Sequence, residues 1–407
     1  MKITFTGDIM IEPPVLKGAK QKDGTYDFYE VFAPAQSLLS EADLLVGNFE
    51  TPMAGPDAKY TQHYYSFNAP DSYADALKKA GFHLVSTVNN HVFDRGFAGL
   101  ERTLDILDDR GIGHTGTWRE RDARSEAWYG KVGDTTVAII AYTVSTNFGG
   151  SGGRCQAVGE KSHMVNMLQS HTGRVFADGV NREKTRIDKL LGFLDREKAG
   201  RIKRLLGFTS SYPRADDYLD KQAMAPYIRQ AQADIRAARE KADVVIFYPH
   251  TGGQFNPLPG AKSIYIVEKA LQAGADAVMA SHAHMVQKAE LNQGRPCVYS
   301  LGNFNMDPHS SIMVNKYLPE YGLAVHLYVD GGKIEKTTFS ITKAVRGKTG
   351  QICAWPVDEL HKTLSEKEQA LLEVDVRQIY KMVNCKDLIE TVIRREYDLD
   401  NEAWIDE

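Results

Sequence analysis

Short runs of small and apolar residues alternate with helix-like segments along much of this chain. KITFTG at the N-terminus, TVAIIAYT near residue 140 and ADVVIFYPH near residue 247 are typical of buried strands. Residues 72–80 are typical of a helix, with Asp71 in front of them as a start signal and Gly81 behind them as a helix breaker. This alternation predicts βαβ units and a largely parallel sheet.

Polar side chains cluster where the predicted strands end. In chain order the clusters are Asp8; Asn48 with Glu50; Asn89, Asn90 and His91; His250; and His282 with His284. In open α/β sheets, ligands bind beyond the carboxyl ends of the strands. Five strands would therefore deliver polar groups to one rim, and we expect the functional site there.

The groups on this rim are of the kinds that bind divalent metals. Such a site needs deprotonated carboxylates and neutral imidazoles that converge from rigid elements, and two neighbouring metals need a bridging carboxylate. Asp8 and Glu50 can supply oxygens, Glu50 as the bridge, and Asn90 can supply an amide oxygen. His250 and the two histidines of the H-x-H pair can supply nitrogens. His91 stands beside Asn90 and could face a substrate instead of a metal.

Each cluster also has a purely structural interpretation. Asp8 follows a glycine and could cap a helix, and Glu50 could be a loop carboxylate. Asn89 and Asn90 could form turns, and His250 precedes a Thr-Gly-Gly sequence that could form another. The coincidence of all five clusters with strand ends favours one site over five unrelated caps and turns.

Residues 145–240 interrupt the alternation and predict a helical insertion. Between residues 182 and 207 the segment carries nine Lys/Arg against four Asp/Glu. One interpretation is a solvated amphipathic helix pair packed on the domain. The other is a docking surface for an anionic substrate.

The C-terminal part of the chain predicts a hairpin followed by helices. GLAVHLYVDGGKIEKTTFSI is typical of two antiparallel strands joined at Asp330, Gly331 and Gly332. Residues 356–407 are helical in pattern and highly charged. We therefore expect a main domain of residues 1–355 and a helical C-terminal extension packed on it.

Composition and hydropathy argue against a nucleic-acid-binding, membrane-spanning or disulfide-rich protein. The net charge of −4 favours neither nucleic acid nor an anionic membrane as a partner. No segment reaches the roughly 18–20 uninterrupted apolar residues of a spanning helix, and the N-terminus lacks the apolar region of a signal peptide. The four cysteines show no C-x-x-C spacing, which is typical of a reduced protein. We expect a cytoplasmic protein without a membrane anchor, of an oligomeric state that the sequence leaves open.

Seven motifs follow one another between residue 1 and about residue 310. They are GDIM, NFETP, NNHVFDRGFAGLERTLDIL, GIGHTG, PHTGGQF, GADAVMASHAHMVQ and VYSLGNF. Their order resembles that of the CapA family, which is linked to capsule and poly-γ-glutamate synthesis and is similar to calcineurin-like metallophosphoesterases. The resemblance implies an α/β fold in which a double β-sheet sandwich is flanked by helices (α/β/β/α).

The resemblance also implies a role for each rim residue. The implied ligands of one or two divalent metal ions (Mn, Fe or Zn) are Asp8, Glu50, Asn90, His250, His282 and His284. Glu50 matches the bridging carboxylate. His91 matches the histidine that protonates a leaving group, and Asp94 matches the partner that orients it.

Two positions depart from the pattern. Calcineurin-like enzymes begin with D-x-H, whereas this chain has Met10 two residues after Asp8, so that one nitrogen ligand is missing. Many CapA-like sequences carry H-W-G-x-E, whereas this chain has Gln254 in place of the charged glutamate.

Two functions fit these residues. The first is a metal-dependent hydrolase in which a metal-activated water cleaves a phosphoester or a γ-glutamyl-type amide of an anionic small molecule or polymer. The second is a non-catalytic protein of capsule or poly-γ-glutamate synthesis that binds a polyanion or a partner protein. A vestigial site is a third interpretation, and the retention of three histidines in register argues against it.

Overall fold

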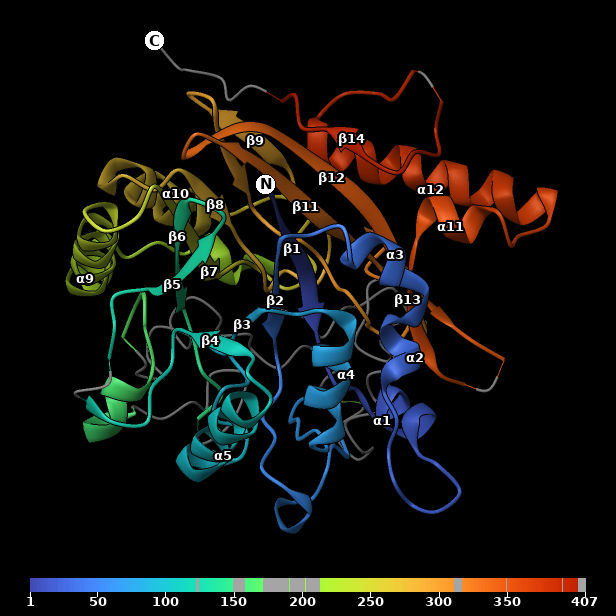
Figure 1. Cartoon of the computed structure of the whole chain (residues 1–407), viewed down its shortest axis with the longest axis horizontal. Coiled ribbons are helices and arrows are strands. Elements are labelled where there is room, and N and C mark those ends of the chain that lie inside the picture. Colours follow the sequence, from blue (N-terminus) through green and yellow to red (C-terminus); the bar gives the residue numbers. More distant parts are fainter. Residues whose placement is uncertain are drawn as a thin grey trace.

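The computed structural model describes residues 1–121, 124–148, 158–170, 213–310, 317–348, 350–389 and 391–401, together with residues 190 and 202. Within them, two β-sheets pack face to face and helices cover their outer faces (Figure 1). The layers run helix, sheet, sheet, helix. The predicted α/β/β/α sandwich is therefore confirmed.

The first sheet has eight strands among the described residues. In spatial order they are β13 (Ile352–Pro356), β12 (Lys333–Arg346), β11 (Tyr321–Asp330), β1 (Lys2–Ile9), β2 (Leu44–Phe49), β3 (Leu84–Ser86) and β4 (Gly113–Thr115), with β14 (Tyr397–Asp398) paired to β12. Strands β1 to β4 are parallel, as the alternation predicts, whereas β11 to β13 are antiparallel. The turn between β11 and β12 is the predicted hairpin at Gly331 and Gly332.

The second sheet has six strands in the described part of the chain. In spatial order they are β5 (Trp128–Val132), β6 (Thr135–Thr143), β7 (Val244–His250), β8 (Ala277–Met279), β10 (Arg295–Val298) and β9 (Ala289–Asn292). The four inner strands are parallel and the two edge strands are antiparallel. The parallel strands are thus divided between two sheets, because the chain opens the second sheet with the antiparallel pair β5 and β6. The predicted largely parallel sheet is confirmed in the inner strands of this second sheet, and the alternation did not specify that two sheets share the parallel strands.

Helices bury the outer face of each sheet. The first sheet packs against α1 (Pro13–Ala19), α2 (Tyr29–Phe32), α3 (Gln36–Leu39) and α4 (Ser72–Ala80), and α5 (Gly96–Asp109) lies beside β4. The second sheet packs against α9 (Lys221–Arg239) and α10 (Ala261–Ala273). Figure 1 shows α1 to α4 on one side of the molecule and α9 and α10 on the other. Helix α4 begins directly after Asp71 and ends at Gly81, as predicted, with a left-handed φ of 97° at that glycine.

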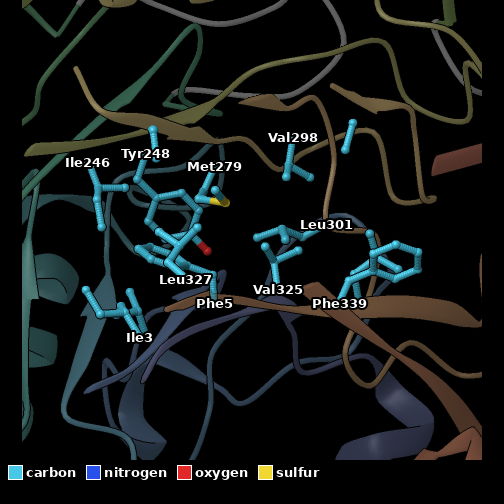
Figure 2. Close-up of a cluster of buried hydrophobic side chains, with 14 of the residues drawn as sticks. Ile3, Phe5, Ile246, Tyr248, Met279, Val298, Leu301, Val325, Leu327 and Phe339 are labelled. Carbon is cyan, nitrogen blue, oxygen red and sulfur yellow. The ribbon is translucent and has the colours of Figure 1, made fainter. Parts of the chain in front are cut away.

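A third apolar layer fills the space between the two sheets. Ile3 and Phe5 of β1 face Ile246 and Tyr248 of β7 across this space (Figure 2). The rings of Phe5 and Tyr248 meet edge to face, with centroids 5.3 Å apart. Because side chains alternate along a strand, this packing decides which residues at the strand ends point between the sheets.

The C-terminal segment continues the first sheet and then adds helices. Helix α11 (Val357–His361) begins where β13 ends, and α12 (Glu366–Asn384) packs its apolar side into the same core as β12. The division into residues 1–355 and 356–407 stays a prediction. The basic segment 182–207 lies outside the described residues, apart from residues 190 and 202. Among the helices that the structure describes, none is both long enough and apolar enough to cross a bilayer.

Candidate metal centre

Asp8 owes its orientation to a β-bulge in β1. Phe5 is the register partner of Val46 in β2, whereas Asp8 is the partner of Asn48, so β1 holds one residue more than β2 over this stretch. The extra residue reverses the alternation of side chains. Phe5 lies between the sheets, whereas Ile9 packs on the helix side of the same sheet. Asp8 is therefore brought to the face between the sheets, where Asn48 also lies.

Gly7 permits a close approach that fixes the backbone of Asp8. A Cβ atom on Gly7 would lie 2.6 Å from the carbonyl oxygen of Gly302, so any side chain there forces a shift. The Asp8 amide donates to the same carbonyl at 2.9 Å, and the amide of Phe304 donates to the Asp8 carbonyl at 2.9 Å. The segment after β10 thus holds Asp8 in place, and the first motif needs a glycine for that reason.

Strands β2 and β7 bring Glu50 and His250 to the same place by simple alternation. Val46 lies in the core between the sheets, and Glu50 follows it by four residues. Tyr248 lies in the same core, and His250 follows it by two residues. The side chains meet where the two sheets end, with Glu50 Oε1 3.6 Å from His250 Nε2.

The H-x-H pair stands on a strained backbone after β8. His282 and His284 have positive φ angles of 109° and 52°, a conformation that costs a residue with a side chain about 1–3 kcal/mol. Neighbouring groups hold it in place. The amide of Phe255 donates to the carbonyl of Ala283 at 2.7 Å, and Asn303 Nδ2 donates to the carbonyl of His284 at 2.8 Å. Strain that is held in this way points to a functional constraint on the two imidazoles.

Glu50 Oε1 is the point on which the imidazoles converge. This oxygen lies 3.6 Å from His250 Nε2, 3.7 Å from His284 Nε2 and 3.9 Å from His91 Nε2. It is buried and has no hydrogen-bond partner among the described residues. A buried carboxylate oxygen is rarely left unpaired, because its desolvation is unfavourable. A cation among these nitrogens would satisfy it.

The electrostatics of Glu50 lead to the same conclusion. Burial raises the pKa of Glu50 well above its ordinary range, and the nearby carboxylates of Asp8 and Asp94 raise it further. Three buried acids this close together need a compensating positive charge to ionise together. A divalent ion supplies that charge and lets carboxylates bind in the deprotonated form.

Two sets of side chains are arranged to hold one metal ion each. The first contains Glu50, His250 and His282, the second contains Asp8, Glu50 and His284, and within each set the ligand atoms lie within 4.8 Å of one another. Glu50 belongs to both sets. A shared carboxylate is what a bridged pair of metals requires. The residues present therefore fit one or two divalent ions.

Asn90 lies beside the first set. Its Oδ1 lies 2.7 Å from His250 Nε2, and that nitrogen lies 3.0 Å from His282 Nδ1. Burial lowers the pKa of both His250 and His282 well below the usual value, and the neighbouring imidazoles lower it further. Both rings are therefore neutral at pH 7, which is the form that binds metals.

Two asparagines connect these side chains to one another. Asn48 Nδ2 donates to Asp8 Oδ1 at 2.8 Å and to Glu50 Oε2 at 3.3 Å. Asn303 Oδ1 lies 3.0 Å from His284 Nδ1, which leaves Nε2 of that ring facing Glu50. The strand-end pattern predicts Asn48 on the rim but does not identify Asn303. Both stand in a Gly-Asn-Phe triplet at or just past the end of a strand, and the repeated triplet is the signal that identifies Asn303.

His91 lies at the edge of the centre with one ring nitrogen fixed. Its Nδ1 lies 2.7 Å from Asp94 Oδ2, which also accepts a hydrogen bond from the amide of Phe67 at 2.6 Å. The Phe67 ring packs on the imidazole, with centroids 4.3 Å apart. With Nδ1 paired to a carboxylate, Nε2 faces Glu50 and the centre.

The structure brings all eight predicted site residues into this one cluster. Met10, which stands where calcineurin-like enzymes carry the histidine of D-x-H, lies away from the cluster. Met10 packs into the core between the first sheet and its helices, on the same side as Ile9 and away from Asp8. The assignment of individual ligands and of a proton donor stays a prediction.

Known proteins resemble this chain over the same region. The family model "Bacterial capsule synthesis protein PGA_cap" matches residues 2–308, which include every site residue named above. The PGA biosynthesis protein CapA of Bacillus subtilis is 22% identical over 347 residues, which cover 84% of this chain and 72% of that protein. The capsule biosynthesis protein CapA of Bacillus anthracis is 24% identical over 335 residues, 80% of this chain and 66% of that protein.

Two further matches are more limited. The uncharacterized protein y4sH of Sinorhizobium fredii is 27% identical over 287 residues, 68% of this chain, and the chain spans only 61% of that relative's length. The crystal structure of a hypothetical protein from Thermus thermophilus aligns with 84% of this chain and 99% of its own, at 15% identity and a TM-score of 0.43. The family model spans well over half of the chain, and the protein belongs to the bacterial capsule synthesis PGA_cap family, within the metallophosphoesterase-like superfamily.

Proposed function

We propose that this protein is a metal-dependent hydrolase that cleaves a phosphoester or a γ-glutamyl-type amide. The observation that supports it most strongly is the unpaired, buried Glu50 Oε1 with three imidazole nitrogens at 3.6–3.9 Å. A merely structural site would pair this oxygen or replace it with an apolar group.

The residues that would hold the metal ions fall into two sets. Glu50, His250, His282 and Asn90 would hold one ion, and Asp8, Glu50 and His284 would hold the other. A divalent ion bound there would polarise a substrate oxygen and lower the pKa of a bound water. Mixed nitrogen and oxygen ligands accept Mn, Fe and Zn, so the donor set does not select the metal.

The side chains around the metals would position a substrate and transfer a proton. His91 would carry a proton on Nε2 and donate it to the leaving group, while Asp94 accepts a hydrogen bond from Nδ1 and stabilises the charged ring. Asn48 and Asn303 would keep the carboxylates and His284 in their binding orientations.

A non-catalytic role in polymer synthesis is the second candidate. Two of the relatives are named for PGA or capsule biosynthesis, and Met10 removes one nitrogen ligand from the second metal set. In this role the centre would bind a polyanion or a partner protein without turnover. Independently of which function holds, we also propose a cytoplasmic location for the protein.

A substrate screen with a metal series distinguishes the two functions. The chain is incubated with Mn²⁺, Zn²⁺ or Fe²⁺ and assayed on bis-p-nitrophenyl phosphate, p-nitrophenyl phosphate and γ-glutamyl-p-nitroanilide. We expect metal-dependent release of nitrophenol or nitroaniline that is lost in Glu50→Gln. Stoichiometric metal binding without turnover of any of the three would favour the non-catalytic role.

A further inference from the structure

We infer that Phe67 is a positioning residue that holds His91 in the orientation needed to deliver a proton to the leaving group. The inference rests on the proposed hydrolase function, in which His91 is the proton donor, and adds to it a residue outside both ligand sets. Phe67 stands in the loop between β2 and α4 and is buried.

Phe67 contacts both members of the pair formed by His91 and Asp94. Its ring lies against the imidazole, with centroids 4.3 Å apart and planes inclined by 31°. Its amide donates to Asp94 Oδ2 at 2.6 Å, and the same oxygen lies 2.7 Å from His91 Nδ1. Phe67 therefore fixes the imidazole directly at its face and, through the carboxylate, at its edge.

The contact at the face restricts a motion that Asp94 alone leaves free. A hydrogen bond at Nδ1 holds one atom of the imidazole but tolerates a spread of angles, so the ring can tilt about that atom. An aromatic ring packed on the face opposes the tilt, because such ring pairs are worth about 0.5–1.5 kcal/mol beyond the burial of their area. With both restraints in place, Nε2 of His91 keeps its direction towards Glu50 Oε1, 3.9 Å away.

Arg95 holds the loop of Phe67 against the segment that carries the pair. Arg95 directly follows Asp94, and its Nη1 donates at 2.5 Å to the hydroxyl of Ser66, the residue before Phe67. Its Nε donates to the carbonyl of Ala58, at the other end of the loop, at 3.0 Å. The position of the Phe67 ring is therefore set by the backbone around it and does not depend on the ring contact alone.

The step that this orientation serves is the departure of the leaving group. The oxygen of the attacking water forms a bond to phosphorus or to the amide carbon, and the scissile bond breaks. The leaving oxygen or nitrogen keeps the electron pair of that bond and takes the proton from His91 Nε2, so that it departs as a neutral alcohol or amine. Proton transfer of this kind depends on the distance and direction between donor and acceptor.

Packing in the core is the competing interpretation of Phe67, which belongs to the apolar cluster beneath the helices of the first sheet. The two interpretations differ in what they predict for catalysis. A proton donor matters most for a strongly basic leaving group, because a weakly basic one departs without a proton. Loss of a positioning residue should therefore slow the release of phenol far more than that of nitrophenol, whereas loss of a packing residue should slow both equally.

Turnover of paired substrates tests this role. Wild type, Phe67→Leu and Phe28→Leu are loaded with Mn²⁺, and their metal content is measured by elemental analysis. Leucine keeps an apolar side chain and the backbone amide but removes the flat ring. Phe28 is the matched control, because it is equally buried in the same cluster and its ring contacts Tyr26 and Tyr73. The substrates are the p-nitrophenyl and phenyl esters of phosphate, or γ-glutamyl-p-nitroanilide and γ-glutamyl anilide, according to the class that wild type cleaves.

We expect equal metal content in the three proteins. Phe67→Leu should lower kcat about 10- to 100-fold on the substrate with the more basic leaving group, up to the loss that a misplaced reacting group causes, and much less on the nitro-substituted substrate. Phe28→Leu should change both rates by the same factor. Phe67→Met replaces Phe67→Leu if the latter does not fold.

Proton NMR of the metal-free proteins gives a second readout that needs no turnover. The Nδ1 proton of His91, bonded to Asp94, should exchange slowly with water in wild type, and its signal is assigned by its absence from His91→Asn. We expect faster exchange in Phe67→Leu and unchanged exchange in Phe28→Leu.

Two results would overturn the inference while leaving the hydrolase intact. One is a change in kcat by the same factor on both substrates in Phe67→Leu. The other is equal exchange of the His91 proton in wild type and Phe67→Leu, including exchange too fast to observe in both. A metal-loaded wild type that cleaves neither class of substrate would instead contradict the proposed function, and the inference would fall with it.

Discussion

Asp94 Oδ2 lies 2.7 Å from His91 Nδ1, and the other nitrogen of that ring points to Glu50 Oε1 at 3.9 Å. The imidazole of His91 thus connects Asp94, which belongs to neither ligand set, with Glu50, which belongs to both. In this position His91 is able to move a proton at Nε2 without leaving its hydrogen bond to Asp94.

Replacement of His91 by Asn should reduce hydrolysis and spare the metals. We expect turnover to fall about 10²- to 10⁴-fold, the usual contribution of a general acid, and Asp94→Asn to give a smaller loss because the ring stays in place. Steady-state kinetics and elemental analysis measure both effects. A His91→Asn protein that loses its metals would identify His91 as a ligand instead.

Asn303 should be necessary for metal affinity although it touches no metal. Asn303→Ala removes the partner of His284 Nδ1, and loss of such an orienting group lowers metal affinity about 10- to 100-fold. Asn305→Ala is the matched control, because Asn305 is equally buried but binds the backbone of Met10 and the hydroxyl of Tyr73. Both variants should lose about 1–3 kcal/mol of stability. Equal metal affinity in the two would contradict the orienting role.

Glu12 should make stability decrease between pH 4.5 and pH 7. Burial, with a smaller contribution from Asp307, raises its pKa to about 7 from 4.5, although hydrogen bonds from Ser310 and the Asp307 amide oppose the rise. The folded state therefore keeps the proton that the unfolded state releases. The stability from this group is complete below pH 4.5 and is lost as pH rises to about 7, up to about 3 kcal/mol.

Glu12→Gln removes this titration and serves as the reference for wild type. Chemical unfolding of both proteins at several pH values should show wild type losing stability relative to the variant as pH rises. Parallel stability curves from pH 4.5 to pH 7 would be inconsistent with a raised pKa at Glu12.

Gly7→Ala should destabilise the fold and weaken metal binding together. The added Cβ would meet the carbonyl of Gly302 at 2.6 Å, and the required shift of β1 should lower the free energy of unfolding by about 1–3 kcal/mol and displace Asp8. Thr6→Ala is the neighbouring control, since its buried hydroxyl has no hydrogen-bond partner among the described residues. Denaturant unfolding and metal titration report the two effects, and unchanged metal affinity in Gly7→Ala would argue against the role of the bulge.

The rim of the site was predictable because it depends on local patterns. Strand ends can be read from apolar runs, and alternation then puts Glu50 and His250 on the same face as the core residues before them. The position of Asp8 depends on register as well. The bulge before it appears only when β1 is paired with β2, and a sequence pattern does not show that pairing.

The division into two sheets, and the residues that hold the metal-binding side chains in place, could not be predicted from the sequence. Nothing in the alternation distinguishes one parallel sheet from two, because the choice is made where β5 and β6 form an antiparallel pair. The positive φ angles of the H-x-H pair come from tertiary contacts with Phe255 and Asn303.

Metal content of Glu50→Gln is the decisive measurement for the proposed metal centre, because Glu50 is shared by both ligand sets. Wild type, Glu50→Gln and His282→Ala are incubated with Mn²⁺ or Zn²⁺, desalted and analysed for metal. We predict about one to two ions per chain in wild type, the largest loss in Glu50→Gln, and a loss confined to one set in His282→Ala. A wild type that holds no metal after either incubation, or a Glu50→Gln protein that holds as much as wild type, would contradict the proposed metal centre.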